Sequence, residues 1–359
     1  METPVNLPVK MLRVPCLREA LKENPTIVPE RYIRDDQEPP VIMDACSGLQ
    51  VPVIELGRLV SEDCAKLELE KLHRACKDWG FFQLINHEVS PALIEKVKKG
   101  TEELFNMPMD EKKKFWRRDG ESGGFGQVFV FSEDQKLDWA EIFNVATLPA
   151  SIRKPHLFPK LPLPFRDDLD AYSKETQTLA VKLLYLMGKA LGMEAKDLEG
   201  MFEDGLQQMR MNYYPPCPQP ELVIGLNSHS DGDAITILLQ VNEMEGLQIR
   251  KDGKWVPVKP LPGAFIINVG DIVEIITNGI YQSIEHRATV NAVKERISIA
   301  TFFHPRIDVE IGPAPSLITP ETPAMFRRIT VAEHLKGYRS RELNGKAYLD
   351  AMRVRHEEP

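Results

Sequence analysis

The spacing of apolar residues divides the chain into a mainly helical first part and a strand-rich second part. Apolar residues recur at three- and four-residue intervals over 61–79 and over 169–191, which predicts two amphipathic helices. Within this part VPVIEL (51–56) and GFFQLINH (80–87) are expected to be short strands. From about residue 207, short apolar runs alternate with turn residues, as they do in β-rich domains.

Nine strand-like runs follow one another closely in the second part. They are QMRMNYY, LVIGLNSHS, AITILLQV, GLQIRK, KWVPVK, AFIINVG, IVEIITN, YQSIEHRATV and RISIATFFH. Lys251-Asp252-Gly253-Lys254 predicts a hairpin with a two-residue turn between two of these strands. Many short strands at close spacing favour a sandwich or a barrel, and a jelly roll is the natural closed form. We therefore predict an α+β fold, with a jelly-roll core flanked by helices.

The same patterns predict four regions along the chain. Residues 1–50 are rich in proline and are expected to form an extended arm with one short helix near Leu17–Lys22. Residues 51–200 form a mainly helical N-terminal region, and residues 204–306 form the jelly-roll core. Residues 307–359 form a C-terminal loop and helix that pack on this core.

Composition and charge exclude several classes of function. Lys and Arg number 45 and Asp and Glu number 53, so the net charge is −8, whereas nonspecific nucleic-acid binding depends on clustered cations. No apolar run approaches the roughly 20 residues that span a bilayer. The first residues, METPVNLPVKML, lack the apolar run of a secretory signal. We expect a cytoplasmic monomer without a nucleic-acid or membrane partner.

The cysteines argue against a disulfide framework and against a cysteine-based zinc site. They are Cys16, Cys46, Cys64, Cys76 and Cys217. Their number is odd, their spacing is scattered, and no C-x-x-C pair occurs. Reduced thiols are the expected state.

Two histidines and one aspartate have the spacing of a metal site. His229 and Asp231 lie two residues apart at the end of a predicted strand, so their side chains face the same side. His286, in a second strand-like run, can supply a third ligand. Two His and one carboxylate form the facial triad of non-haem Fe(II) oxygenases, which leaves positions open for a cosubstrate and dioxygen. An H-x-D triplet alone is more often ordinary polar structure, so this prediction needs support from other residues.

A second set of residues has the chemistry of a carboxylate site. Arg296 opens RISIATFFH, and strand alternation puts Ser298 on the same face. A buried Arg is costly unless it is paired, and its guanidinium fork matches the two oxygens of a carboxylate. An internal Arg–Asp salt bridge remains an alternative for Arg296. Asn212 and Tyr214 share a face of another run, where the Tyr hydroxyl either donates to the same carboxylate or faces water.

Several segments taken together closely resemble the plant 2-oxoglutarate- and Fe(II)-dependent dioxygenases. They are DWGFFQLINH, GFGQ, SEDQKLDWAEIF, RMNYYPPCPQPEL, LNSHSDGDAITILLQ, EGLQI, KWVPVKPLPGAFIINVGD, NGIYQSIEHRATVN and ERISIATFFHP. The resemblance covers roughly residues 51–350. It is closest to the specialised-metabolism branch, which includes senescence-related-gene-type proteins and the opium-poppy alkaloid O-demethylases. The fold that it implies is a double-stranded β-helix, which is a jelly roll.

The resemblance also implies a role for each set of residues. The iron ligands would be His229, Asp231 and His286. The residues that contact 2-oxoglutarate would be Arg296, Ser298, Tyr214 and Asn212, with the first two on its distal carboxylate. The implied reaction is the hydroxylation, O-demethylation or desaturation of a plant specialised metabolite by dioxygen. Succinate and CO2 would be the co-products, and ascorbate would serve as the reductant.

Candidates for contact with the substrate are less well defined. Phe302 lies on the Arg296 face of its strand and is the first candidate for stacking on an aromatic substrate, and His304 shares this face. Phe125 and Phe129, in and after a glycine-rich segment, are either further candidates or core residues. Asp233 replaces the small or apolar residues that many relatives have after the ligand Asp. The favoured interpretation of Asp233 is a solvated turn residue, and the alternative is a residue facing the substrate entrance.

Three other functions remain open. The first is an oxidase on the same scaffold that does not use 2-oxoglutarate and binds the carboxylate of its substrate at Arg296 and Ser298. The second is a non-catalytic jelly roll that binds a metal or a small molecule. The third is a zinc hydrolase, for which no general-base Glu is evident close to the triad. The sequence does not define the substrate, and alkaloids, coumarins, flavonoids and terpenoids all remain open.

Overall fold

The computed structural model describes residues 11–14, 16–23, 26–38, 49–194, 197–198 and 200–354. Much of the predicted arm, including Cys46, lies outside these ranges, while the predicted short helix is present as α1 (Leu17–Glu23). The cysteines at 16, 64, 76 and 217 are free thiols. In the ranges given above, no helix has the length and apolar character needed to cross a membrane.

Two β-sheets form the core, and their strands come from both halves of the chain. The larger sheet has the strand order β1-β2-β10-β7-β12-β5-β4-β3, and the smaller has the order β6-β11-β8-β9. The strands of the larger sheet are β1 (Val53–Glu55), β2 (Phe81–Ile85), β3 (Gly124–Phe125), β4 (Glu141–Leu148), β5 (Leu206–Tyr214), β7 (Ile235–Gln240), β10 (Phe265–Val269) and β12 (Arg296–His304). Those of the smaller sheet are β6 (Leu226–His229), β8 (Leu247–Lys251), β9 (Lys254–Pro257) and β11 (His286–Ala288). The predicted α+β fold with a jelly-roll core is confirmed.

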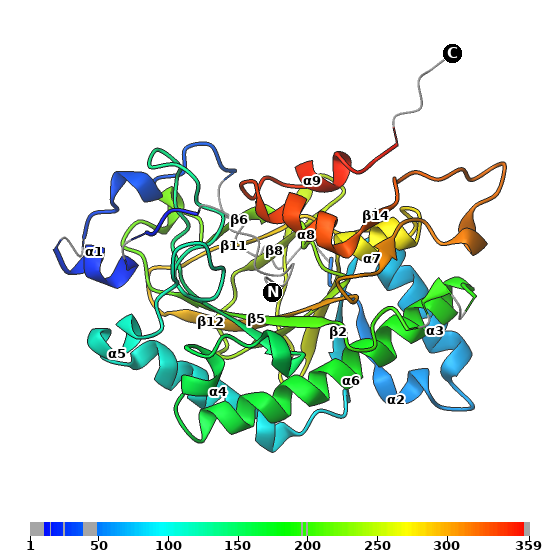
Figure 1. The fold of residues 1–359 in the computed structure, drawn as a ribbon, viewed down its shortest axis with the longest axis horizontal. Coiled ribbons are helices and arrows are strands. Elements are labelled where there is room, and N and C mark those ends of the chain that lie inside the picture. Colours follow the sequence, from blue (N-terminus) through cyan, green and yellow to red (C-terminus); the bar gives the residue numbers. More distant parts are fainter. Residues whose placement is uncertain are drawn as a thin grey trace, which may run out of the picture.

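Helices cover the outer face of the larger sheet (Figure 1). Helix α6 (Phe165–Leu191) contacts α3 (Ala65–Arg74), α4 (Pro91–Asn106) and the strands β4, β7 and β12. On the other side of the molecule, the C-terminal segment with α8 (Val331–Arg339) and α9 (Ala347–Asp350) lies over β6. The remaining elements are α2 (Leu56–Leu59), α5 (Met109–Lys113), α7 (Asp271–Ile276), β13 (Glu310–Ile311) and β14 (Ile329–Thr330). The jelly roll is therefore covered by helices from both ends of the chain.

Local sequence signals explain where several elements begin and end. The Ser90 hydroxyl accepts a hydrogen bond from the backbone N–H of Leu93 and caps α4. The predicted hairpin joins β8 to β9, and both turn residues, Asp252 and Gly253, have positive φ angles of 50° and 75°. Positive φ at both central positions is the requirement of the turn that suits twisted strands. The hairpin prediction is confirmed.

The structure corrects one strand and adds two others. IVEIITN is not a strand, because Asp271–Ile276 form helix α7, in which all six residues are buried. A helix buried on all sides has no amphipathic pattern, so its sequence resembles a buried strand. Strands β3 and β4 were not predicted, and most residues of β4 are buried, which removes the polar–apolar alternation. The region 51–200 thus adds four strands to the larger sheet. The division of the chain into four regions stays a prediction.

Candidate active site

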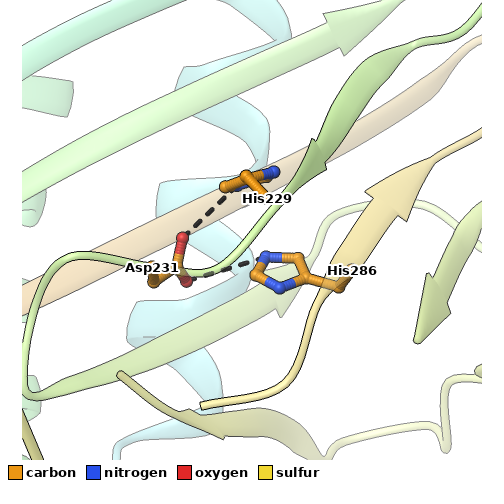
Figure 2. A group of neighbouring side chains, drawn as sticks. All are labelled: His229, Asp231 and His286. Carbon is orange, nitrogen blue, oxygen red and sulfur yellow. Dashed lines mark ion pairs between the residues drawn. The ribbon is translucent and has the colours of Figure 1, made fainter. Parts of the chain in front are cut away.

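The three side chains with metal-site spacing meet at one edge of the smaller sheet (Figure 2). His229, the last residue of β6, lies directly opposite His286, the first residue of β11, in an antiparallel pair. Asp231 follows β6 by two residues. The ligand atoms of the three side chains lie within 4.8 Å of one another, and the residues are only 1%, 7% and 4% exposed. The structure thus brings together the three residues that the sequence predicted, and their role as metal ligands stays a prediction.

The hydrogen bonds of the two histidines leave their Nε2 atoms as acceptors. The Nδ1 atom of His229 is 2.7 Å from the carbonyl oxygen of Asn227, and that of His286 is 3.0 Å from the carbonyl oxygen of Ile284. A carbonyl oxygen only accepts, so each Nδ1 carries a proton, and in the neutral tautomer that this selects Nε2 has the lone pair. Burial lowers the pKa of His286 to about 4, which keeps this ring neutral at pH 7.

These Nε2 atoms face the carboxylate of Asp231. Nε2 of His229 is 3.4 Å from Oδ1, and Nε2 of His286 is 3.7 Å from Oδ2. Two imidazole nitrogens and a carboxylate therefore converge on one point, which is an arrangement that can hold a cation. Two imidazoles and one carboxylate are a ligand set that suits Fe(II), so the residues present fit the ion.

Two neighbouring side chains fix the carboxylate of Asp231. Its Oδ2 accepts hydrogen bonds from Nδ2 of Asn268, at 2.7 Å, and from the hydroxyl of Thr236, at 2.8 Å. Burial acts to raise the pKa of Asp231, but the facing histidines His286 and His229 hold it below its usual range. This carboxyl group is therefore ionised, as a metal ligand must be.

Asp233 is a buried residue and not a solvated turn residue. It is 1% exposed, and its Oδ2 accepts the backbone N–H of Phe303 at 3.3 Å. Burial, together with the charge of Asp231, raises the pKa of Asp233 well above its usual range. The favoured sequence interpretation of this residue is therefore wrong. Asp233 lies instead in the wall of a cavity next to the triad.

The predicted carboxylate-binding residues lie on two adjacent strands of the larger sheet. Arg296 on β12 pairs with Tyr214 on β5, and Ser298 pairs with Asn212. Arg296 is 3% exposed, donates to Oε1 of Gln240 at 2.9 Å, and has an Nε without a hydrogen-bond partner. No carboxylate of the described residues forms an ion pair with it, so the internal salt bridge proposed as an alternative is absent there. A buried guanidinium of this kind is suited to a bound carboxylate.

An inner cavity joins the two sets of residues. It is lined by members of both, namely Asn212, Tyr214, Asp231, His286, Arg296 and Ser298. An outer cavity lies next to it, and Arg210, Asp231 and Phe302 line both. A ligand held at Arg296 can therefore reach the metal-binding group, and a second ligand can approach the same group from the outer cavity.

Three of the four predicted substrate residues line the outer cavity. They are Phe129, Phe302 and His304. Phe125 does not, because it belongs to the edge strand β3 and packs in the core with its ring centroid 4.8 Å from that of Phe143. The structure therefore agrees with the interpretation of Phe125 as a core residue, while contact with a substrate stays a prediction.

Sequence reasoning missed two cationic residues in the outer cavity. Arg210 on β5 is 7% exposed, its guanidinium lies 5.2 Å from the Phe302 ring, and its side chain makes no hydrogen bond or ion pair with the described residues. Its position two residues before Asn212, on the same strand face, was an available signal. Arg339 comes from α8 and donates to Oε1 of Gln208 at 3.2 Å. No local pattern indicated that the C-terminal helix reaches this cavity.

Comparisons with known proteins agree with this geometry. The profile of the 2OG-Fe(II) oxygenase superfamily matches residues 205–305, and the profile described as non-haem dioxygenase in morphine synthesis N-terminal matches residues 51–161. Protein SRG1 of Arabidopsis thaliana is 54% identical, over 95% of this chain and 96% of its own length. Oxoglutarate-dependent flavonoid 7-O-demethylase 1 of Ocimum basilicum is 53% identical, over 97% and 93%. Codeine O-demethylase of Papaver somniferum is 51% identical, over 99% and 100%.

Solved structures show the same architecture. The crystal structure of JOX2 in complex with 2OG, Fe and JA has a TM-score of 0.86 and 30% identity, and the match covers 96% of this chain and 99% of that one. The dioxygenase for auxin oxidation from rice has a TM-score of 0.72 and 26% identity, over 85% and 100%. The relatives are thus similar along nearly the whole chain, in sequence and in fold.

Proposed function

This chain belongs to the 2OG-Fe(II) oxygenase superfamily, and from that premise we propose that His229, Asp231 and His286 hold its Fe(II). The chain is a 2-oxoglutarate- and Fe(II)-dependent dioxygenase, an oxidoreductase that acts on a plant metabolite. One observation carries the metal assignment: the ligand atoms of three buried residues lie within 4.8 Å of one another, and the Nδ1 atom of each histidine is already bound to a backbone carbonyl. Fe(II) at this position would satisfy all three.

We propose that Arg296 and Ser298 bind the distal carboxylate of 2-oxoglutarate, with Tyr214 and Asn212 beside it. The support is the buried Arg296, which has no acidic partner in the described residues and opens onto the same cavity as the triad. Burial strengthens the charge-assisted hydrogen bonds from the guanidinium to a carboxylate. The other end of the cosubstrate would lie on the Asp231 side, because the cavity is lined from Arg296 along β12 as far as Phe302 and includes Asp231.

The side chains of this site orient ligands and exclude water. Bound Fe(II), together with 2-oxoglutarate and dioxygen, supplies a two-electron oxidation of a substrate C–H bond, with succinate and CO2 as co-products. The Nδ1–H bonds of His229 and His286 fix the plane of each ring, and Asn268 and Thr236 fix the Asp231 carboxylate. Because all three ligands are nearly fully buried, bulk water is kept from the reacting atoms.

We propose that the substrate is an aromatic, oxygen-bearing plant specialised metabolite and that the reaction is an O-demethylation. Two of the relatives named above, each more than 50% identical, are O-demethylases. Phe302 and Phe129 supply aromatic walls to the outer cavity, and His304 lies at its side. We further propose a cytoplasmic monomer that uses ascorbate as reductant and has no nucleic-acid partner, in line with a net charge of −8.

The test is a screen of methoxylated flavonoids, coumarins and alkaloids with Fe(II), 2-oxoglutarate and ascorbate. The expected result is formation of succinate and formaldehyde together with a demethylated product, detected by mass spectrometry. The Asp231→Ala variant is the negative control. Product formation without consumption of 2-oxoglutarate would support the oxidase alternative and contradict this proposal. A hydroxylated or desaturated product would retain the enzyme class but exclude demethylation.

A further inference from the structure

We propose that Arg34 is a positioning residue for His229, that it acts through Asn227, and that it sets how tightly the protein holds its metal. Arg34 belongs to the N-terminal segment 26–38, far from His229 in the sequence. The inference rests on the proposed role of His229 as a metal ligand. It adds to that role a part of the chain that lines neither the inner nor the outer cavity described above.

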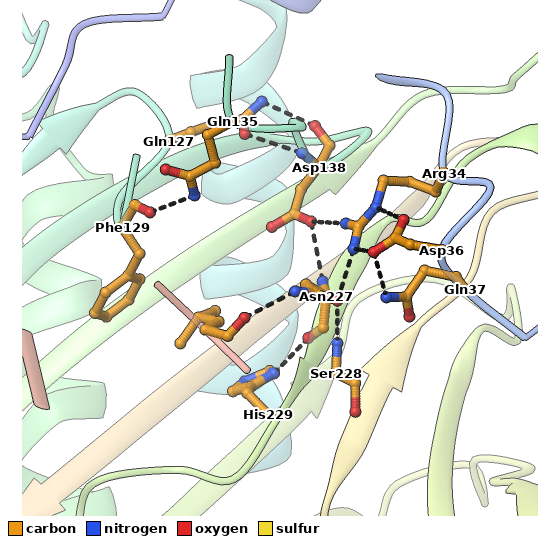
Figure 3. Close-up of polar contacts among 11 residues, drawn as sticks. Arg34, Asp36, Gln37, Gln127, Phe129, Gln135, Asp138, Asn227, Ser228 and His229 are labelled. Atoms are coloured by element: carbon orange, nitrogen blue, oxygen red, sulfur yellow. Dashed lines mark hydrogen bonds and ion pairs between the residues drawn. The ribbon is translucent and has the colours of Figure 1, made fainter. Parts of the chain in front are cut away.

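Asn227 is the residue that orients His229 (Figure 3). Its carbonyl oxygen accepts the Nδ1–H bond of His229 at 2.7 Å. Its backbone N–H donates to Oδ1 of Asp138 at 3.0 Å. Because the second bond holds the backbone at position 227, it also holds the carbonyl that sets the ring plane of His229.

The side chain of Asn227 ties this backbone to two more segments. Its Oδ1 accepts a hydrogen bond from Nη2 of Arg34 at 3.2 Å and another from the backbone N–H of Ser228 at 2.9 Å. Its Nδ2 donates to the carbonyl oxygen of Leu343 at 2.8 Å. The N-terminal segment and the C-terminal segment therefore meet at the residue that orients the ligand. Loss of one tie releases part of this constraint.

Arg34 is itself held in one orientation. Its side chain is 6% exposed, its Nε and Nη2 donate to the two carboxylate oxygens of Asp36, each at 2.8 Å, and its Nη1 lies 3.9 Å from Oδ1 of Asp138. The backbone N–H of Arg34 donates to the carbonyl oxygen of Leu222 at 2.7 Å. One planar guanidinium thus contacts Asp36, Asn227 and Asp138 at once. A lysine ammonium cannot reproduce this planar fork.

His286 is oriented by a different set of hydrogen bonds, so the proposed effect of Arg34 is specific to His229. Its Nδ1–H bond goes to the carbonyl oxygen of Ile284 at 3.0 Å. The preceding residue, Ser283, donates its backbone N–H to Oε2 of Glu274 at 2.7 Å, and both Ser283 and Glu274 are at most 2% exposed. Arg34 takes no part in these bonds, and its segment reaches the strand of His286 through another residue, Glu38, whose carbonyl oxygen accepts a hydrogen bond from Nη1 of Arg287 at 2.6 Å. The loss of Arg34 should therefore disturb one of the two histidines.

The experiment compares full-length Arg34→Met with Arg31→Met. Arg31 lies in the same segment and also contacts the body of the protein, through Glu133 at 3.3 Å and the carbonyl oxygen of Gln135 at 3.3 Å, but its side chain bonds to these residues and not to Asn227. The apo protein is titrated with Co(II) or Mn(II). We expect the metal dissociation constant to rise about tenfold in Arg34→Met, the low end for residues that support a ligand, and to change less than about twofold in Arg31→Met. Arg34→Lys should not restore the wild-type value.

Two further readouts separate positioning from general loss of structure. The visible spectrum of bound Co(II), which reports ligand geometry, should shift in Arg34→Met and not in Arg31→Met. In a double-mutant cycle, Arg34→Met and Asn227→Ala should together cost no more metal affinity than Asn227→Ala alone, because Asn227→Ala already removes the acceptor through which Arg34 acts. Additive losses would overturn the proposal.

Other outcomes are equally decisive. Unchanged metal affinity in Arg34→Met, or equal losses in Arg34→Met and Arg31→Met, would overturn the positioning role. The His229→Ala variant distinguishes this failure from a failure of the metal assignment. If His229→Ala bound metal as the wild type does, the assignment of the ligand itself would be wrong. If it lost the metal while Arg34→Met did not, only the positioning proposal would fail.

Discussion

The metal end and the cosubstrate end of this site are built in different ways. The proposed cosubstrate residues are all paired in two neighbouring strands of nine residues each, with Arg296 opposite Tyr214 at one end of the pair and Ser298 opposite Asn212 two residues further in. Of the proposed metal-binding residues, His229 and His286 are end residues of the short strands β6 and β11, and Asp231 lies outside any strand, two residues after β6. At the cosubstrate end the sheet itself sets the positions. At the metal end, loops and both terminal segments contribute.

This difference shows which contacts fix the orientation of the side chains at each end of the site. Inside a paired strand, register and alternation fix which side chains face one another, so few additional contacts are needed. At a strand end the backbone has fewer sheet partners, so the orientation of His229 depends on bonds from Asp138, Arg34 and the C-terminal segment through Asn227. Changes at the two ends should therefore have separable effects.

The largest expected effect is loss of metal from Asp231→Ala. The change removes the carboxylate that both histidines face, so the metal dissociation constant should rise about a hundredfold or more. Asp233→Asn is the matched control, because it alters a neighbouring buried carboxyl that is not a proposed ligand and should change this constant only a few-fold. Isothermal titration of the apo proteins measures both. Equal losses would show that the metal end is not defined by the triad.

The second largest expected effect is a loss of affinity for 2-oxoglutarate without a loss of affinity for the metal. In Arg296→Met, the dissociation constant of 2-oxoglutarate should rise about a hundredfold, since a carboxylate loses its buried cation. In Ser298→Ala the dissociation constant of 2-oxoglutarate should rise about fivefold, as expected for the loss of one hydrogen bond. Metal affinity without 2-oxoglutarate should stay within about twofold of wild type in both. A parallel fall in metal affinity would contradict the separation of the two ends.

A smaller effect, on the stability of the protein, is expected at Arg210, which lines both the inner and the outer cavity. This buried guanidinium has no hydrogen-bond partner in the described residues. Its removal in Arg210→Met should raise the free energy of unfolding of the apo protein by about 1–3 kcal/mol, because an unsatisfied buried polar group is lost. Urea unfolding measures this change. Arg250→Met, at a partly exposed arginine with ionic partners, is the control and should give no gain. A destabilised Arg210→Met would contradict the expectation.

The smallest expected effect is the pH dependence of stability that comes from Asp138, the residue that binds the backbone N–H of Asn227. Burial raises the pKa of Asp138 to about 6, although Arg34 opposes the rise. The folded protein then binds this proton more tightly than the unfolded chain, whose Asp titrates near ~4. The stability contributed by Asp138 is greatest below pH ~4 and falls as the pH rises to about 6.

Asp138→Asn lacks this titration, so its stability relative to wild type should increase between pH 4 and pH 6 and then level off. Thermal unfolding at pH 4, 5, 6 and 7 gives the difference. Asp134→Asn, at an exposed position of the same loop, should show no such trend. A stability difference that does not vary with pH would mean that folding does not raise the pKa of Asp138.

Much of the site could be predicted because strands obey local rules. Alternation placed Arg296 and Ser298 on one face, and the H-x-D spacing placed His229 beside Asp231. Arg210 follows the same rule as Asn212 and was overlooked, so the sequence held the signal. The buried helix α7 could not be distinguished from a strand, because a run that is buried on all sides has no periodicity.

Other parts could not be predicted by local rules at all. The bond from Arg34 to Asn227 joins residues that are 193 positions apart in the sequence, and neither residue belongs to a motif with that spacing. The burial of Asp233 likewise depends on its contact with Phe303 from β12, a strand much later in the chain. Such contacts are products of the tertiary fold and have no signature in a short window of sequence.

The strand order of the larger sheet has a consequence for how the protein folds during translation. Strand β12 lies between β7 and β5 in the middle of the sheet, yet it is the last of the eight to leave the ribosome. Until Arg296–His304 emerge, the facing edges of β5 and β7 have no partner and resemble sites of edge-to-edge association. Folding must wait for pairings between distant parts of the chain, which makes it slow. The nascent chain should therefore depend on chaperones that shield these edges during translation.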